Sequence, residues 1–173
     1  MNARKFSRGV LWTTFVVYCL AVFGILFLDG RSGRFPYNSV WEYIRYSVNP
    51  IPFKTIFGYV KDVMEKGHYM VALAVRNVFG NFILFYPMGV FLPCLFKRVR
   101  MIRQTALISL CTILAVEIIQ LIFRRGVFDI DDLILNMTGW LLGFLTFSIP
   151  FVRRLLKKMS ILNEDEILTE RED

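Results

Sequence analysis

Histidine and cysteine, which build many catalytic and metal sites, are almost missing from this chain. Its 173 residues include one histidine, His68, and three cysteines, Cys19, Cys94 and Cys111. One histidine cannot supply a His-based metal site or a Ser-His-Asp triad, and the cysteines are too scattered for a metal motif. We therefore predict that the protein holds no metal and no cofactor, and that its cysteines serve only in packing.

Long polar stretches are also scarce, which argues against a soluble domain. Hydrophobic residues make up 55% of the chain, and its mean hydropathy is +0.50. Runs of about 18 or more mostly apolar residues can cross a bilayer as helices. The first run is too long for a signal peptide and is expected to be retained. The four predicted spans are Val10–Leu28, Val78–Phe96, Gln104–Phe123 and Leu133–Phe151. They predict an all-α integral membrane protein with one four-helix membrane domain, residues 10–151.

The formal charge of +7 is distributed in a way that predicts a topology and excludes a nucleic-acid partner. Basic residues cluster at the ends of the predicted spans, and such clusters usually face the cytoplasm. We expect residues 1–9 and the charged tail, residues 152–173, to be cytoplasmic, so that both termini lie inside. The loops over residues 29–77 and 124–132 then face outward. The clustered basic residues are Arg4, Lys5, Arg8, Lys97, Arg98, Arg100, Arg103, Arg153, Arg154, Lys157 and Lys158.

The first outer loop, residues 29–77, contains two stretches with helical spacing of apolar residues. One follows Trp41 and Ile44, and the other follows Val60 and Val63. Both are expected to be short amphipathic helices lying at the membrane interface. Two prolines between them predict an extended segment over residues 49–53. The loop is either a surface-anchored spacer or a flap that contacts a substrate.

Polar side chains inside the apolar spans provide the strongest functional signal. A charged side chain at membrane depth costs roughly 2.5–3.5 kcal/mol on insertion scales, so it is usually paired or functional. Helical spacing places Glu117, Gln120 and Arg124 on one face of the third span. At about 1.5 Å per residue, polar groups of three spans reach one level near the outer boundary. We predict an outward-facing ligand pocket built from Asn81, Glu117, Gln120, Arg124, Arg125, Asp129, Asp132 and Asn136, with Asn77 beside them.

Two glycines of the fourth span, Gly139 and Gly143, are separated by three residues. This small-x-x-x-small spacing lets a second helix approach closely. The partner helix is expected either in the same chain or in a second copy, which would form a homodimer through this face.

The polar residues also carry a resemblance to a known family. The patterns are Asn81-x-x-x-Phe85-x-Pro87-x-Gly89, Glu117-x-x-Gln120, Phe128-Asp129-x-Asp131-Asp132 and Asn136-x-x-Gly139, with Asn49-x-x-Pro52-Phe53 in the outer loop. Together they resemble the VanZ-like membrane family of bacteria. The resemblance implies a multi-pass protein of the bacterial plasma membrane and a link to resistance to the lipoglycopeptide teicoplanin. It supplies no catalytic residues.

Three functions remain open on this basis. The favoured one is a non-enzymatic envelope protein whose partners are the lipid bilayer and a lipoglycopeptide or lipid-linked cell-wall precursor. The second is an intramembrane enzyme that acts on a lipid headgroup, with Glu117 and Asp129 or Asp132 as acid and base, or with an Asp129/Asp131/Asp132 cluster holding Mg²⁺ or Ca²⁺. In the third, the polar side chains only pair with one another between helices.

Overall fold

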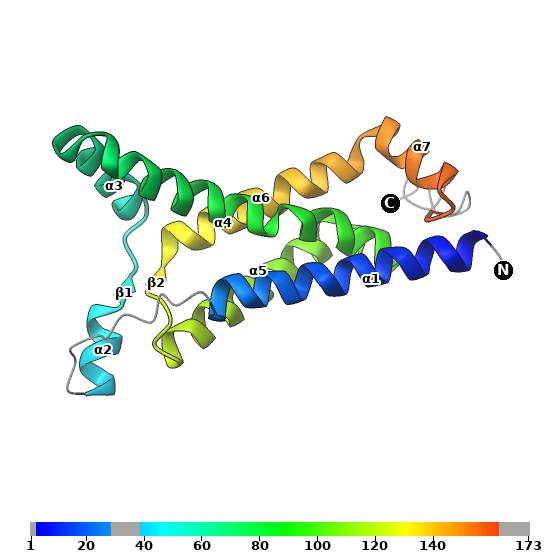
Figure 1. The fold of residues 1–173 in the computed structure, drawn as a ribbon. Helices are drawn as coiled ribbons and strands as arrows, with labels where there is room; N and C mark the ends of the chain where they lie inside the picture. The colour runs from blue at the N-terminus through cyan, green and yellow to red at the C-terminus, as the bar shows by residue number, and fades with distance from the viewer. Residues whose placement is uncertain (1–2, 29–38, 163–173) are drawn as a thin grey trace.

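The computed structural model describes residues 3–28 and 39–162, and it confirms a helical protein with four long helices. These run side by side, while the shorter elements gather at their two ends (Figure 1). All four are long and apolar enough to cross a membrane. The long helices are α1 (Ala3–Phe23), α4 (His68–Leu95), α5 (Ile102–Ile122) and α6 (Ile130–Ser148).

The helix boundaries differ from the predicted spans mainly at two places. α4 begins at His68, well before the predicted start at Val78, because the intervening residues contain no proline or glycine to stop a helix. α1 continues into a short π-helix, η1 (Gly24–Leu28). π-Helical turns inside a helix are rare and occur frequently at functional sites.

The two amphipathic helices predicted in the outer loop are confirmed as α2 (Val40–Tyr46) and α3 (Lys54–Lys66). The segment between them is only partly extended, which corrects the prediction for residues 49–53. Its first part forms strand β1 (Val48–Asn49), which pairs in parallel with β2 (Phe128–Asp129). The chain then turns, and Phe53 adopts a left-handed backbone with φ 63° immediately before α3.

The first part of the charged tail, residues 152–173, belongs to a further helix. Helix α7 (Pro150–Lys158) starts with a proline, which suits the first turn of a helix. The Arg153 guanidinium lies 5.0 Å from the centre of the Phe147 ring, and Ile161 and Leu162 are buried in a cluster with Phe147. The acidic segment from residue 163 onward lies outside the described residues.

The closest helix pair is α4 with α6, and glycines make it possible. A Cβ atom at Gly139 would overlap the Phe82 carbonyl oxygen, and one at Gly143 would overlap that of Tyr86. The prediction of close helix packing at these glycines is therefore confirmed. The partner is α4 of the same chain, so the proposed homodimer through this face is wrong: the surface it needs is already covered.

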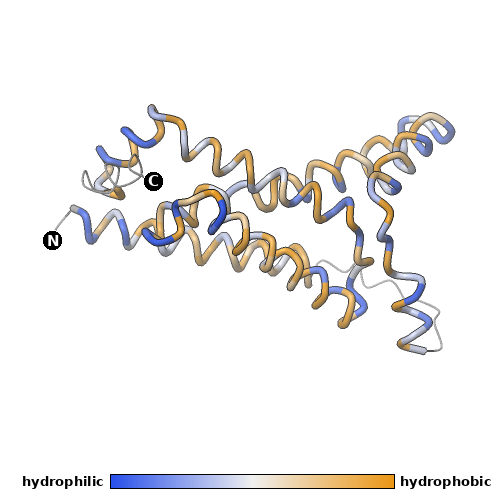
Figure 2. The backbone as a smooth tube through the Cα atoms, turned by 180° about the vertical axis from the view of Figure 1, so that it is seen from behind, coloured by the Kyte–Doolittle hydropathy of each residue, from blue (hydrophilic) through white to orange (hydrophobic). Residues whose placement is uncertain are grey.

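Hydrophobic residues predominate along the long helices, as the colour of the tube in Figure 2 shows, and many of them are exposed. On α1, Val17 is 59% exposed and Leu20 is 66% exposed. An apolar surface of this extent on spanning helices is the surface that contacts lipid. The small interior core lies between α4 and α5, around Phe85, Met88, Leu92 and Ile113.

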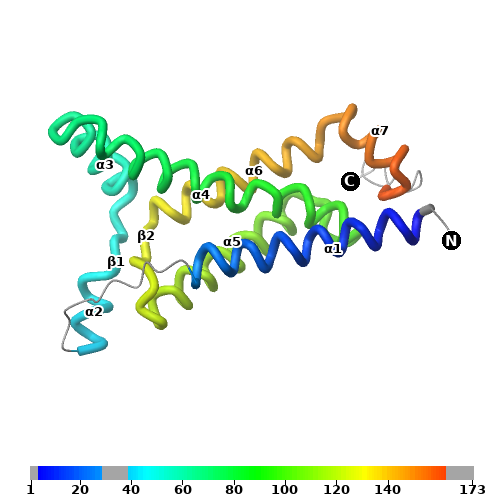
Figure 3. The backbone as a smooth tube through the Cα atoms, viewed as in Figure 1, coloured from blue at the N-terminus to red at the C-terminus, as the bar shows by residue number. Residues whose placement is uncertain are grey.

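The two ends of the molecule carry different short elements. Helices α2 and α3 and the paired strands lie together at one end, and α7 and the start of α1 lie at the other (Figure 3). The functional residues predicted from the sequence gather towards the end that carries the paired strands.

Candidate functional site

A polar cavity of about 520 Å³ lies where α3, the paired strands, α4, α5 and α6 meet. Side chains from the outer loop and from three of the long helices contribute to its wall. The polar cavity is lined by Leu26, Asn49, Lys54, Thr55, Tyr59, Asn77, Asn81, Phe85, Val116, Glu117, Gln120, Arg125, Gly126, Val127, Asp129, Asp132 and Asn136.

All the predicted ligand-binding residues except Arg124 line this cavity. The expected face of Glu117, Gln120 and Arg124 is wrong for Arg124, because α5 ends at Ile122 and Arg124 turns into a left-handed conformation with φ 53°. The Arg124 guanidinium instead lies 5.7 Å from the ring centre of the buried Tyr43. Of the two adjacent arginines, Arg125 is the one that reaches the polar cavity.

Four lining residues from the outer loop were missed in the sequence: Asn49, Lys54, Thr55 and Tyr59. Asn49 reaches the site because β1 pairs with β2 and sets Asn49 opposite Asp129. The Asn49 amide donates to the Asp129 carboxylate at 3.2 Å and to the Thr55 hydroxyl at 3.0 Å, and the Thr55 hydroxyl donates to Asp129. The only sequence signal for this contact was the family pattern Asn49-x-x-Pro52-Phe53.

The three neighbouring aspartates point in different directions. Asp129 bonds the outer loop, and Asp132 accepts a hydrogen bond from the Asn81 amide of α4. Asp131 is fully buried and accepts the backbone N–H groups of Thr55 at 2.8 Å and Ile56 at 3.1 Å. Within residues 3–28 and 39–162, no three His, Cys, Asp or Glu side chains gather as a metal site. The geometry therefore gives no support to a metal-binding aspartate cluster.

Further hydrogen bonds join the other helices around the cavity. The Asn77 amide of α4 donates to the Tyr59 hydroxyl of α3 at 2.5 Å. The Gln120 amide of α5 donates to the Leu26 carbonyl oxygen of η1 at 3.2 Å. These bonds tie the outer loop and the end of α1 to the walls of the cavity.

Several buried acceptors that line the cavity lack a donor among the described residues. Glu117 is 5% exposed, and no described side chain donates a hydrogen bond to it. Asn136 is 4% exposed, and neither its Oδ1 nor the buried Oδ1 of Asn49 has a hydrogen-bond partner in the described part of the chain. Buried polar groups are nearly always hydrogen-bonded, so acceptors of this kind call for an explanation.

The charges of the cavity are mixed. The carboxyl groups of Glu117, Asp129 and Asp132 share the wall with the cationic side chains of Lys54 and Arg125. Carboxylate and amide oxygens accept hydrogen bonds from hydroxyl and ammonium groups, whereas arginine and lysine bind phosphates and carboxylates. The cavity can therefore hold a polar group that presents several donors.

Four helices that can span a membrane, with a polar cavity towards one end, define the chain as a multi-pass membrane protein with a candidate ligand site. The sequence model of the VanZ/LLP1 family matches residues 15–153, which include every long helix and the cavity, and the chain belongs to this family. It is 30% identical over 95 residues to Protein VanZ of Enterococcus faecium. That alignment covers 55% of this chain and 58% of the relative, so the chain spans less than two thirds of that protein. No solved structure matches the chain.

Proposed function

We propose that this protein lowers the effect of lipoglycopeptide antibiotics such as teicoplanin by binding an amphiphilic ligand in the polar cavity, without catalysing a reaction. Membership of the VanZ/LLP1 family supports the connection to this class of antibiotic. The observation that carries the ligand site is a pair of buried amide oxygens, Oδ1 of Asn49 and Oδ1 of Asn136, which line the cavity beside the buried Glu117 and have no donor among the described residues.

Helix packing alone explains these side chains poorly. Polar contacts between membrane helices stabilise a protein by about 0.6 kcal/mol on average. This stabilisation is small compared with the cost of burying many polar groups. A buried acceptor without a donor costs about 1–3 kcal/mol. The buried Oδ1 atoms of Asn49 and Asn136 therefore destabilise the fold unless a ligand supplies the missing donors.

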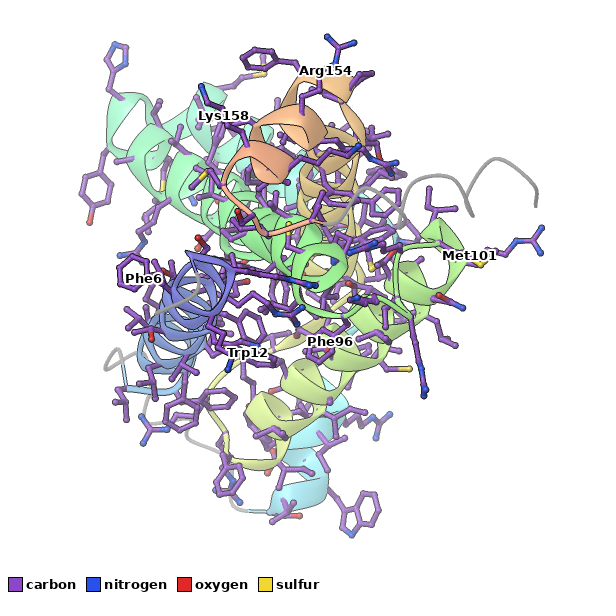
Figure 4. All side chains as sticks on the ribbon, turned by 90° about the vertical axis from the view of Figure 1, so that its right-hand side faces the viewer. Phe6, Trp12, Phe96, Met101, Arg154 and Lys158 are labelled. Carbon is purple, nitrogen blue, oxygen red and sulfur yellow. The ribbon has the colours of Figure 1, made fainter. Side chains whose placement is uncertain are left out.

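The polar cavity is proposed to face the outside of the cell, with both ends of the described chain inside. Support comes from the positive-inside rule, since the basic connection after α4 and the basic residues of α7 lie at the end away from the cavity. Figure 4 views this basic end, with Met101, Arg154 and Lys158 labelled. A cavity on the outer side is open to an antibiotic without transport across the membrane.

An enzyme that acts on a lipid headgroup or a lipid-linked cell-wall precursor is the second candidate. It is favoured by one observation: Glu117 and Asp132 line the same cavity as Arg125, which could hold a phosphate. Such an enzyme would change the lipid or precursor composition when it is overproduced. A binding protein would leave that composition unchanged.

The proposed function is tested by measuring teicoplanin and vancomycin susceptibility in a deletion strain at matched membrane levels of each variant. We expect Glu117→Gln, Asp132→Asn and Arg125→Gln to lose teicoplanin tolerance selectively. Arg124→Gln is the matched control, because Arg124 packs on Tyr43 outside the cavity and should keep tolerance. If wild type restores no tolerance to the deletion strain, resistance is rejected, and lipid profiling then tests the enzyme.

A further inference from the structure

A second cavity, of about 480 Å³, lies between α1, α4 and α5 and is almost wholly apolar. Its wall includes Phe15, Val22, Met88, Leu92 and Ile108. We call it the apolar cavity. Aromatic and aliphatic side chains of this kind suit a hydrocarbon chain and offer nothing to a polar ligand.

The apolar cavity adjoins the polar cavity. Leu26, Phe85 and Val116 line both, one from each of η1, α4 and α5. Val116 immediately precedes Glu117, so the wall changes from apolar to acidic within one residue of α5. The two cavities therefore form an amphipathic pair whose boundary is set by the π-helix η1 and the hydrogen bond from Gln120 to Leu26.

The far end and the side of the apolar cavity differ in access. At the end away from the polar cavity, the Trp12 and Phe96 rings meet edge to face with centroids 5.5 Å apart, and both are labelled in Figure 4. Along the side, Phe23 is 54% exposed and Ile108 is 38% exposed on the apolar outer surface of the helices. A hydrocarbon chain can therefore enter sideways from the bilayer.

We propose that the two cavities together bind one glycolipid, with its hydrocarbon chain in the apolar cavity and its sugar head in the polar cavity. This inference rests on the proposed function, since it names the chemical class of the amphiphilic ligand. Among the described residues, the buried Oδ1 atoms of Asn136 and Asn49 are acceptors without a donor, and no described group donates a hydrogen bond to Glu117. Sugar hydroxyls supply several donors close together, whereas a phosphate ester carries acceptors that cannot satisfy them.

The two parts of the lipid have different roles. Moving a hydrocarbon chain from the bilayer into an apolar cavity exchanges one apolar environment for another, so it adds little hydrophobic free energy. Recognition comes mainly from the hydrogen bonds of the head, and the chain fixes the position of the lipid. The test must therefore report where the hydrocarbon chain of the lipid lies.

The probe is an alkyl maltoside with a photoreactive diazirine near the end of its chain, added to the full-length protein in phosphatidylcholine nanodiscs. We expect crosslinks on peptides of α1, α4 and α5 that line the apolar cavity. Thr112→Trp fills this cavity, and overpacking should lower the labelling about fivefold or more. Ala115→Trp is the matched control on the same helix, because Ala115 is exposed and lines neither cavity; its labelling should equal wild type.

A variant in the polar cavity, where the sugar head is proposed to bind, separates this inference from the proposed function. Glu117→Gln should also lower labelling by the maltoside, and an alkyl phosphocholine of the same chain length should compete poorly. If Glu117→Gln lowers labelling but Thr112→Trp does not, binding of the hydrocarbon chain in the apolar cavity is overturned, and ligand binding in the polar cavity stands. If neither variant changes labelling, both are overturned. Equal competition by the phosphocholine would overturn the assignment of a sugar head.

Discussion

The Asp131 carboxylate, in the first turn of α6, accepts the backbone N–H of Thr55 at 2.8 Å and so caps α3, a helix far away in the sequence. Phe53, the residue at the start of α3, has no side chain able to do this. Free N–H groups at a helix start need an acceptor. Asp131 therefore fixes the outer-loop helix over the polar cavity.

Replacing Asp131 should release α3. Loss of a side-chain cap typically costs about 0.5–2 kcal/mol, and we expect Asp131→Ala to be near the upper end because it removes an acceptor of several N–H groups. Hydrogen exchange of the α3 amides should become faster in the variant. Asp62→Ala, which removes only the exposed pair of Asp62 with Lys66, is the control and should leave exchange at the start of α3 unchanged. Equal protection in both variants would contradict the capping role.

Helix packing between α4 and α6 should depend on Gly143. Gly143→Ala places a methyl group on the Tyr86 carbonyl oxygen, so the helices must separate, at a cost of about 1–3 kcal/mol. Gly80→Ala is the matched control, because open space surrounds Gly80 and alanine is the better helix former. Melting in detergent should drop for Gly143→Ala and should hold or rise for Gly80→Ala. A similar drop in both would show that the close approach does not limit stability.

The two asparagines Asn81 and Asn136 should respond oppositely to removal of their amides. Asn81→Leu takes a donor from the Asp132 carboxylate and should destabilise the protein by about 1–3 kcal/mol. Asn136→Leu removes a buried acceptor to which no described residue donates, so it should be nearly neutral or stabilising while ligand binding falls. Detergent melting and maltoside labelling of both variants check this. Strong destabilisation by Asn136→Leu would assign it a packing role.

The proposed outward orientation of the polar cavity can be tested with single cysteines. After Cys19, Cys94 and Cys111 are replaced, Met64→Cys on α3 and Leu155→Cys on α7 provide reporters that are 81% and 48% exposed. A membrane-impermeant maleimide should label the α3 position in intact cells. It should reach the α7 position only after the cells are permeabilised. The reverse pattern would turn the cavity to the cytoplasm and remove direct access for the antibiotic.

Local regularities account for the parts of this protein that were predictable. The four spans, α2 and α3 follow from the length of apolar runs and from helical spacing, which depend only on neighbours along the chain. The polar cavity was largely predictable too, because Asn81, Glu117 and Asn136 lie at similar depths and buried polar groups must converge. The prediction was wrong for Arg124 because helical spacing holds only within a helix, and α5 ends at Ile122, before Arg124.

Tertiary structure alone decided the rest. The parallel pairing that sets Asn49 against Asp129, and the capping of α3 by Asp131, join residues with no local signal for each other. The spacing of the glycines of α6 predicted a closely packed helix, but only the fold shows that this helix is α4. Sequence determines which segments enter the membrane, because transfer from water is a property of each segment by itself. Which polar groups meet there, and which stay without a partner, depends on how the helices pack.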